Sequence, residues 1–170
     1  MRASLDTVRL LLEHGSDAPL CNDEGDDAFH CAALFGRVDI LEHLVEKLEP
    51  TPQRQADAYS LIGATFVVNQ FNEHEDAKQG LAFWKKSANI QTENLTADPA
   101  EDISLGPNSA YNYAVEARYA ESLAVIEGNV DAMRMQVLVV RERILGVYRR
   151  ETIWGLDKCA KYYRDLGALY

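Results

Sequence analysis

The sequence has few of the features that mark secreted, membrane-spanning or nucleic-acid-binding proteins. Its 170 residues include three cysteines and no CxxC spacing, which argues against a disulfide framework and favours a reducing compartment. No apolar run approaches the length of a membrane span, and residues 1–6 lead directly into an amphipathic pattern without a signal peptide. Lys and Arg total 17 against 27 Asp and Glu, a net charge of −10, which argues against binding to nucleic acid. We therefore expect a cytoplasmic or nuclear protein with no membrane partner and, through its acidity, a basic protein partner.

Motifs for catalysis and for metal binding are also missing. The chain has no Gly-rich phosphate loop and no G-x-S-x-G motif, and no spacing in it predicts that two carboxylates lie together at one site. His30 and Cys31, with Cys21 and His43 nearby, could suggest zinc, but their spacing fits no standard site, and adjacent helical residues point in different directions. Cys159 occupies a core position of an amphipathic pattern. We expect no enzyme, no metal and no cofactor, since an active site would have to be assembled by long-range contacts alone.

Two segments 33 residues apart share one pattern. Residues 6–13 (DTVRLLLE) align with 39–46 (DILEHLVE), with acids at both ends and apolar residues at the same helical positions. A 33-residue period is that of the ankyrin repeat, a turn plus two helices that bury their apolar faces against neighbouring repeats. Between them, 27–32 (DAFHCA) matches the ankyrin pattern T-P-L-H-x-A at its His and its last Ala, and Asp27 can cap the helix. The sequence predicts the C-terminal end of an ankyrin array at 1–49, with two unrelated amphipathic helices as the alternative.

A second repeat signature follows the Pro-x-Pro break at 50–52. Residues 59–66 (YSLIGATF) fit the W-x2-L-G-x2-Y pattern of a tetratricopeptide first helix, in which Gly63 would let a partner helix approach closely. Apolar residues along 77–88 predict that partner helix. The pattern returns at 163–170 (YRDLGALY), which suggests a further unit and a sequence cut from a longer solenoid.

The remaining stretches complete a predicted all-α helical repeat solenoid. Residues 92–107 are polar and irregular, whereas a stripe of apolar residues predicts a helix from 130 to 145. Its segment Arg141-Glu142-Arg143 is interpreted as a solvated face with local ion pairs. The predicted divisions are an ankyrin end at 1–49, a degenerate tetratricopeptide-like helix pair at 50–91, an irregular insertion at 92–129, and a helix with the start of a further unit at 130–170.

Four acids form the candidate ligand-binding site. Asp23, Glu24, Asp26 and Asp27 occupy the turn that an ankyrin repeat projects towards its ligand and the start of the next helix. We hypothesise that they extend an acidic groove and steer a basic peptide to it. The alternative is a solvated turn without a ligand.

Several segments, in their order along the chain, resemble the feminization (Fem) family of ankyrin-repeat proteins. They are 60–66 (SLIGATF) after the ankyrin block, 110–113 (AYNY), 133–136 (MRMQ) with 141–146 (RERILG), and 167–170 (GALY). After Leu145-Gly146 the family typically continues with a turn containing Pro and His, whereas residues 147–150 here are VYRR.

The resemblance implies a substrate receptor of a cullin-RING ubiquitin ligase, a non-enzymatic subunit that recognises degrons for proteasomal degradation. In that family, degrons are recognised mainly through earlier ankyrin repeats, and the cullin-binding box lies further towards the C-terminus. A generic ankyrin scaffold or adaptor without a ubiquitin link is the competing interpretation.

Overall fold

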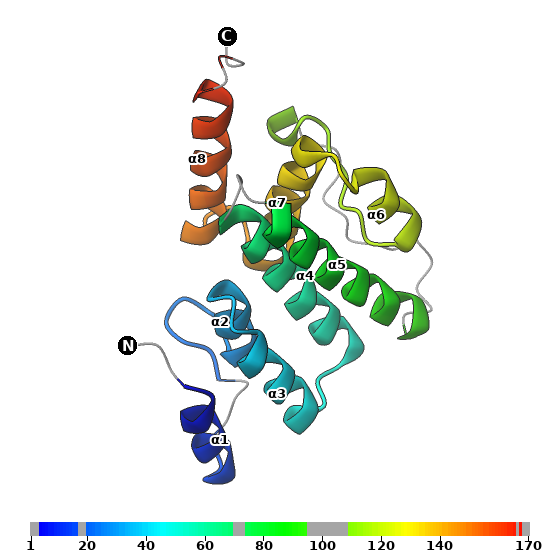
Figure 1. Ribbon diagram of the computed structural model, residues 1–170. Coiled ribbons are helices and arrows are strands. Elements are labelled where there is room, and N and C mark those ends of the chain that lie inside the picture. The colour runs from blue at the N-terminus through cyan, green and yellow to red at the C-terminus, as the bar shows by residue number, and fades with distance from the viewer. Residues whose placement is uncertain (1–3, 17–19, 70–73, 95–108, 166, 168–170) are drawn as a thin grey trace.

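A computed structural model describes residues 4–16, 20–69, 74–94, 109–165 and 167 of the chain. Within these ranges the protein consists of α-helices and one short 3-10 helix, with no β-strand, which confirms the predicted all-α fold (Figure 1). The elements are α1 (Leu5–Glu13), α2 (Ala28–Leu34), α3 (Val38–Leu48), α4 (Pro52–Asn69), α5 (His74–Asn94), η2 (Ser109–Tyr111), α6 (Ala120–Ile126), α7 (Val130–Leu145) and α8 (Arg150–Asp165).

Helices α1 to α3 form the ankyrin end, and local sequence explains where they begin and end. The side chain of Asp27 caps α2 by accepting a hydrogen bond from the backbone N–H of His30 at 2.9 Å, as the sequence predicts. Gly36, between α2 and α3, has φ +65°, a left-handed conformation that glycine adopts without a steric penalty. The pattern repeated 33 residues apart therefore corresponds to α1 and α3, which pack against each other.

Helix α4 lies at the centre of the fold and is buried on nearly every side (Figure 1). One side contributes Tyr59 and Ile62 to a core shared with α2 and α3. The opposite side contributes Ala64 and Val68 to a second core shared with α5, α6 and α7. A helix that is apolar all round is expected inside a fold rather than on its surface. Because it belongs to both cores, α4 couples the ankyrin end to the helices that follow.

Helices α4 and α5 cross antiparallel at a pair of glycines. A Cβ atom on Gly63 would lie 2.7 Å from Trp84 Cδ1 and 2.8 Å from the Gly80 carbonyl oxygen. The indole N–H of Trp84 donates to the Ser60 carbonyl at 3.0 Å. Trp84 is 2% exposed. The close approach predicted for Gly63 is therefore present, and it is what allows Trp84 to lie in the core between the two helices.

The segment predicted to be an irregular insertion is largely ordered where the structure describes it. Helix α5 continues to Asn94, beyond the predicted boundary at 92, and α6 forms at 120–126. The amide side chain of Gln136 holds the backbone of Ala117, accepting from its N–H at 2.8 Å and donating to its carbonyl at 2.9 Å. Most of the polar stretch 92–107 lies outside the described residues.

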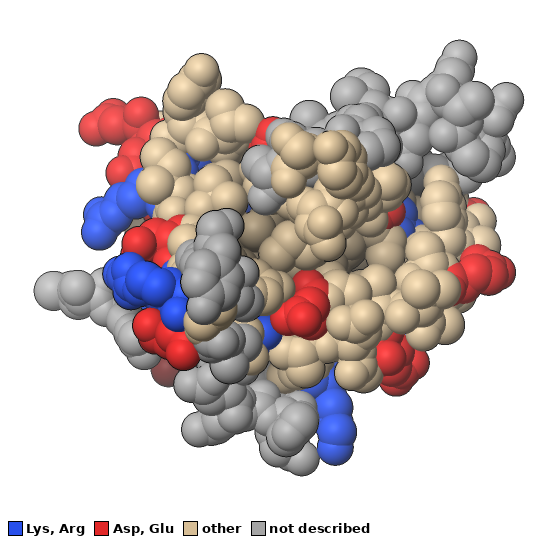
Figure 2. All heavy atoms as spheres, turned by 90° about the horizontal axis from the view of Figure 1, so that it is seen from above, with Lys and Arg blue, Asp and Glu red and all other residues tan. Residues whose placement is uncertain are grey.

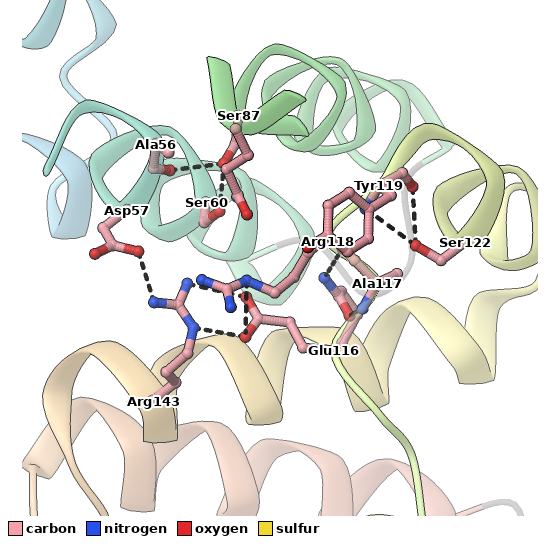
Figure 3. A network of polar contacts seen from close by, with 12 residues as sticks. Ala56, Asp57, Ser60, Ser87, Glu116, Ala117, Arg118, Tyr119, Ser122 and Arg143 are labelled. Carbon is pink, nitrogen blue, oxygen red and sulfur yellow. Dashed lines mark hydrogen bonds and ion pairs between the residues drawn. The ribbon is translucent and has the colours of Figure 1, made fainter. Parts of the chain in front are cut away.

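The interpretation of Arg141-Glu142-Arg143 as a solvated face is wrong. Arg141 and Glu142 are buried, and the Arg143 side chain is 11% exposed. Arg143 donates through Nε to Glu116 at 2.5 Å and through Nη1 to Asp57 at 2.6 Å (Figure 3). The physical reason is that α7 is covered on this side by α4 and by the segment before α6, so its charges need internal partners.

Burial alone would lower the pKa of the Arg143 guanidinium, but the charges and hydrogen bonds of Glu116 and Asp57 raise it above its usual value. The neighbouring Arg118 lies 4.0 Å from the same Glu116 carboxylate (Figure 3). Burial and the positive charge of Arg143 lower the pKa of Arg118. This network joins α4, α7 and the segment before α6.

Helix α8 includes the beginning of the second tetratricopeptide-like pattern. Residues 163–165 form its last turn, and Gly167 follows with φ +68°, outside the helix. Residues 166 and 168–170 of that pattern lie outside the described residues. Cys159 is buried against Leu138 and Val139 of α7, as expected for a small core residue.

Candidate interaction site

The turn before α2 is fixed by its own side chains. The Asn22 side-chain oxygen accepts hydrogen bonds from the backbone N–H groups of Glu24 and Asp26, both at 2.9 Å. Gly25 has φ +84°, which lets the chain reverse at this position. The four predicted acids, Asp23, Glu24, Asp26 and Asp27, are therefore held in defined positions relative to α2.

These four acids fall into two pairs with different environments. Asp23 and Glu24 are exposed, whereas Asp26 is 6% and Asp27 is 3% exposed. The four acids are close together in the sequence, but only Asp23 and Glu24 present their carboxylates to solvent. The other two meet cationic groups of the same chain.

Asp27 bonds the ankyrin end to α4. Its carboxylate forms an ion pair with Arg54 of α4, and its Oδ1 lies 3.1 Å from Nδ1 of His30. Burial by itself would raise the pKa of Asp27, but hydrogen bonds with His30 and the charges of His30 and Arg54 lower it to about 2. The hydrogen bond with Asp27 in turn raises the pKa of His30. His30 is thus a partner of the helix cap, and its ring faces a carboxylate.

Asp26 is paired with the turn between α7 and α8. Nη2 of Arg149 lies 2.6 Å from the Asp26 carboxylate and 3.7 Å from that of Glu24. Nε of the same arginine lies 3.7 Å from Glu151. Arg149 therefore sits among three acids. It belongs to the 147–150 stretch that departs from the family pattern.

A pocket of about 440 Å³ opens between this turn, α2 and the start of α8. Figure 1 shows the beginning of α8 facing α2 across this region. The pocket is lined by Asn22, Glu24, Asp26, Cys31, Leu34, Phe35, Arg141, Arg150, Glu151 and Trp154. Phe35 at the end of α2 is 71% exposed and Trp154 on α8 is 39% exposed, so two aromatic side chains at the rim are open to solvent.

The sequence interpretation missed most of this site. It singled out the turn but not Arg149, Arg141 or Trp154, which come from more than a hundred residues away. A signal was available for Arg141, because it follows Val137 by four positions and so falls on a buried face of α7. No comparable signal identifies Arg149, which lies between two helices.

Charges are mixed elsewhere on the surface. In the view of Figure 2, acidic and basic side chains lie at separate points around a largely uncharged centre and form no single acidic patch. Among the described residues, no three His, Cys, Asp or Glu side chains are placed to hold a metal ion. None of the described helices is long and apolar enough to cross a membrane.

Comparison with known proteins agrees with this architecture. Residues 1–45 match the family described as "Ankyrin repeats (many copies)", so this part of the chain consists of ankyrin repeats. The chain is 31% identical over 136 residues to Protein fem-1 homolog C of Homo sapiens, covering 80% of this chain and 21% of that protein. It is also 31% identical over 148 residues to Sex-determining protein fem-1 of Caenorhabditis elegans, covering 86% of this chain and 22% of that one.

A third relative, Protein fem-1 homolog A of Danio rerio, is 31% identical over 137 residues, with 80% and 22% of the two chains covered. These matches extend beyond the ankyrin block into the helices that follow it. The chain belongs to the Fem family of ankyrin-repeat proteins. It spans about a fifth of the length of the relatives it matches.

Proposed function

We propose that this chain is the joint of a substrate-recognition subunit of a cullin-RING ubiquitin ligase, between its ankyrin repeats and its later helical repeats. The proposal is supported chiefly by the matches to fem-1 relatives, which cover the ankyrin block and the following helices together. Ankyrin repeats bind other proteins, so the coarser role of a protein-interaction module follows from the family itself. The subunit acts by holding a substrate and performs no chemistry of its own, in the cytoplasm or nucleus.

A substrate receptor has to hold its ligand-binding end at a fixed position relative to its docking end. The described helices suit this requirement, because α4 shares one core with α2 and α3 and a second core with α5, α6 and α7. Polar contacts reinforce it: the Tyr59 hydroxyl donates to Glu42 at 2.9 Å, and Lys86 of α5 donates to the other oxygen of Glu42 at 2.7 Å. With Asp26–Arg149 and Asp27–Arg54, these contacts tie α2 and α3 to three later elements.

The four acids of the turn contribute in two ways under this proposal. Asp23 and Glu24, which are exposed, add negative charge that draws a basic degron towards the ankyrin surface. Asp26 forms an ion pair with Arg149, and Asp27 forms one with Arg54. Both acids therefore fix the turn and do not contact a ligand.

The ligase role is tested on the complete gene product. That product carries an affinity tag in cells, and cullin and the RING subunit are sought in the eluate by mass spectrometry. We expect both to be recovered with the complete product and not with the 170-residue chain, because the family's cullin-binding box lies further towards the C-terminus. If the complete product recovers no cullin, the ligase role is wrong and a scaffold without a ubiquitin link takes its place.

The role of the exposed acids is tested in the same complete product. Asp23→Asn combined with Glu24→Gln should weaken binding of Arg- and Lys-containing peptides by about two- to fivefold at low salt, and less at high salt. Glu121→Gln is the control, since this exposed acid lies on α6, across the fold from α2 (Figure 1). Equal affinities for the three proteins would show that the turn does not steer a ligand.

A further inference from the structure

Arg141 is a buried cation without an acidic partner in the part of the chain that the structure describes. It is 2% exposed and lines the pocket between α2 and α8. Its Nη1 donates to the backbone carbonyl of Glu151 at 2.9 Å, and its buried Nε has no acceptor. Its guanidinium carbon lies 5.7 Å from the centre of the Trp154 ring.

Other arginines of the fold, in contrast to Arg141, have carboxylate partners. Arg54, Arg143 and Arg149 each meet at least one carboxylate within ion-pair distance. Burial lowers the pKa of Arg141, and the more distant negative charge of Glu151 offsets this effect only in part, so that the pKa is about 10. A buried charge without a counterion lowers stability, and groups whose pKa is strongly shifted by burial cluster at functional sites.

The acids at the rim of the pocket are not counterions of Arg141, because they surround Arg149 instead. Asp26, Glu24 and Glu151 all point to Arg149, at 2.6, 3.7 and 3.7 Å. Arg150, which is exposed, adds a further positive charge to the same rim. The pocket lining therefore carries charges of both signs, and Arg141 is a cation in it without a carboxylate at ion-pair distance among the described residues.

The walls of the pocket determine what would accompany an anion. Leu34, Phe35 and Trp154 supply apolar surface beside Arg141, and Phe35 is largely exposed to solvent at the mouth. A small-molecule site would enclose most of its ligand, whereas this mouth is open and combines apolar with charged side chains, as a peptide-binding surface does. Aromatic side chains and arginine are also the residues that contribute most to binding energy at protein interfaces.

We propose that this pocket binds a peptide segment of a partner protein in which an acidic side chain stands next to a large apolar one. The carboxylate pairs with Arg141, and the apolar side chain lies between Phe35 and Trp154. The inference rests on the role of the chain as a protein-binding module and does not depend on the ligase link. It concerns the opposite ligand charge from the exposed acids of the turn, although Glu24 of that turn also lines this pocket.

The test is selection of peptides by the 170-residue chain itself. A phage-displayed library of random linear peptides is panned against the immobilised chain, and enriched sequences are synthesised and measured by fluorescence polarisation. We expect enrichment of Asp or Glu beside Leu, Phe or Trp. Changing that acid to its amide should weaken binding at least about tenfold, because a charge-assisted hydrogen bond is lost.

Variants of the chain place the binding on this pocket. Arg141→Met keeps the aliphatic stem and removes the charge, and should abolish binding while the melting temperature stays the same or rises. Phe35→Ser changes an exposed side chain and should weaken binding without affecting folding. Arg164→Gln, which removes an exposed positive charge further along α8, is the control that should bind like the wild type.

Enriched peptides without an acidic residue would overturn the proposal, and so would a Phe35→Ser chain that binds with unchanged affinity. Failure to enrich any peptide would overturn it as well. Recovery of cullin by the complete product is a separate measurement, so failure here and failure of the ligase role remain distinguishable.

Discussion

Nη2 of Arg149 lies 2.6 Å from the Asp26 carboxylate, although the two residues are 123 positions apart in the sequence. One belongs to the turn before α2 of the ankyrin end, and the other to the turn that leads into α8. The pair closes the ankyrin repeat against the last helix of the fold. It also turns an acid that the sequence offers to a ligand into an internal contact.

Asp26→Asn should therefore lower the free energy of unfolding by about 2 kcal/mol, because it leaves the largely buried Arg149 guanidinium with weaker partners. Glu24→Gln is the matched control. This acid lies 3.7 Å from the same guanidinium but its side chain is 61% exposed, so its loss should cost less than about 0.5 kcal/mol. Urea unfolding followed by tryptophan fluorescence measures both. Equal losses for the two variants would show that Asp26 is not part of a buried joint.

Gly63→Ala should destabilise the α4–α5 pair by about 1–3 kcal/mol, even though alanine favours a helix by about 1 kcal/mol. The new methyl group would lie 2.7 Å from Trp84 Cδ1 and 2.8 Å from a backbone oxygen, so one helix has to move. Gly155→Ala, in α8, is the control. Its nearest neighbours lie at 3.4 Å, and we expect unchanged or slightly higher stability. Thermal melts of both variants decide the matter, and a Gly63→Ala chain as stable as the wild type would contradict the close crossing.

The stability of the ankyrin end should depend on pH through His30 and Asp27. The pKa of His30 is raised in the folded chain, so its contribution is complete below the unfolded value of about 6.5 and is lost as the pH rises through the folded value. The pKa of Asp27 is lowered to about 2, so its contribution is present above about pH 4 and is lost as the pH falls towards 2.

The difference in unfolding free energy between the wild type and His30→Gln should accordingly shrink from about pH 5 to about pH 9. Urea titrations across this range measure it, and the comparison cancels the contributions of the other histidines. Two parallel stability curves would mean that the contact between His30 and Asp27 carries no pH dependence.

Arg143→Met should destabilise the chain by about 3–5 kcal/mol, because it leaves the Glu116 carboxylate buried without its closest partner. Adding Glu116→Gln to this variant should restore part of the loss, since the unpaired charge is then gone. The double-mutant cycle, measured by chemical denaturation, gives their coupling. Additive losses would show that the two residues of Figure 3 contribute independently.

Much of the fold was predictable from local patterns. The 33-residue repeat predicts α1 and α3, Asp27 predicts the start of α2, and Gly63 predicts the close crossing of α4 and α5. Each of these depends on residues within a turn or two of one another, or on a period that a helix imposes. The segment 109–129 was harder, because its order comes from distant side chains such as Gln136.

The charged residues show most clearly what only the tertiary structure decided. By itself, the sequence determined an all-α ankyrin-repeat chain with an acidic turn, since helical periodicity and capping are local. Whether an acid or an arginine meets solvent depends on which helix packs over it, and that is set by contacts across the whole chain. Packing of α4 and α8 against α2 and α7 paired Asp26 and Asp27 internally and buried Arg141 without an acid partner among the described residues.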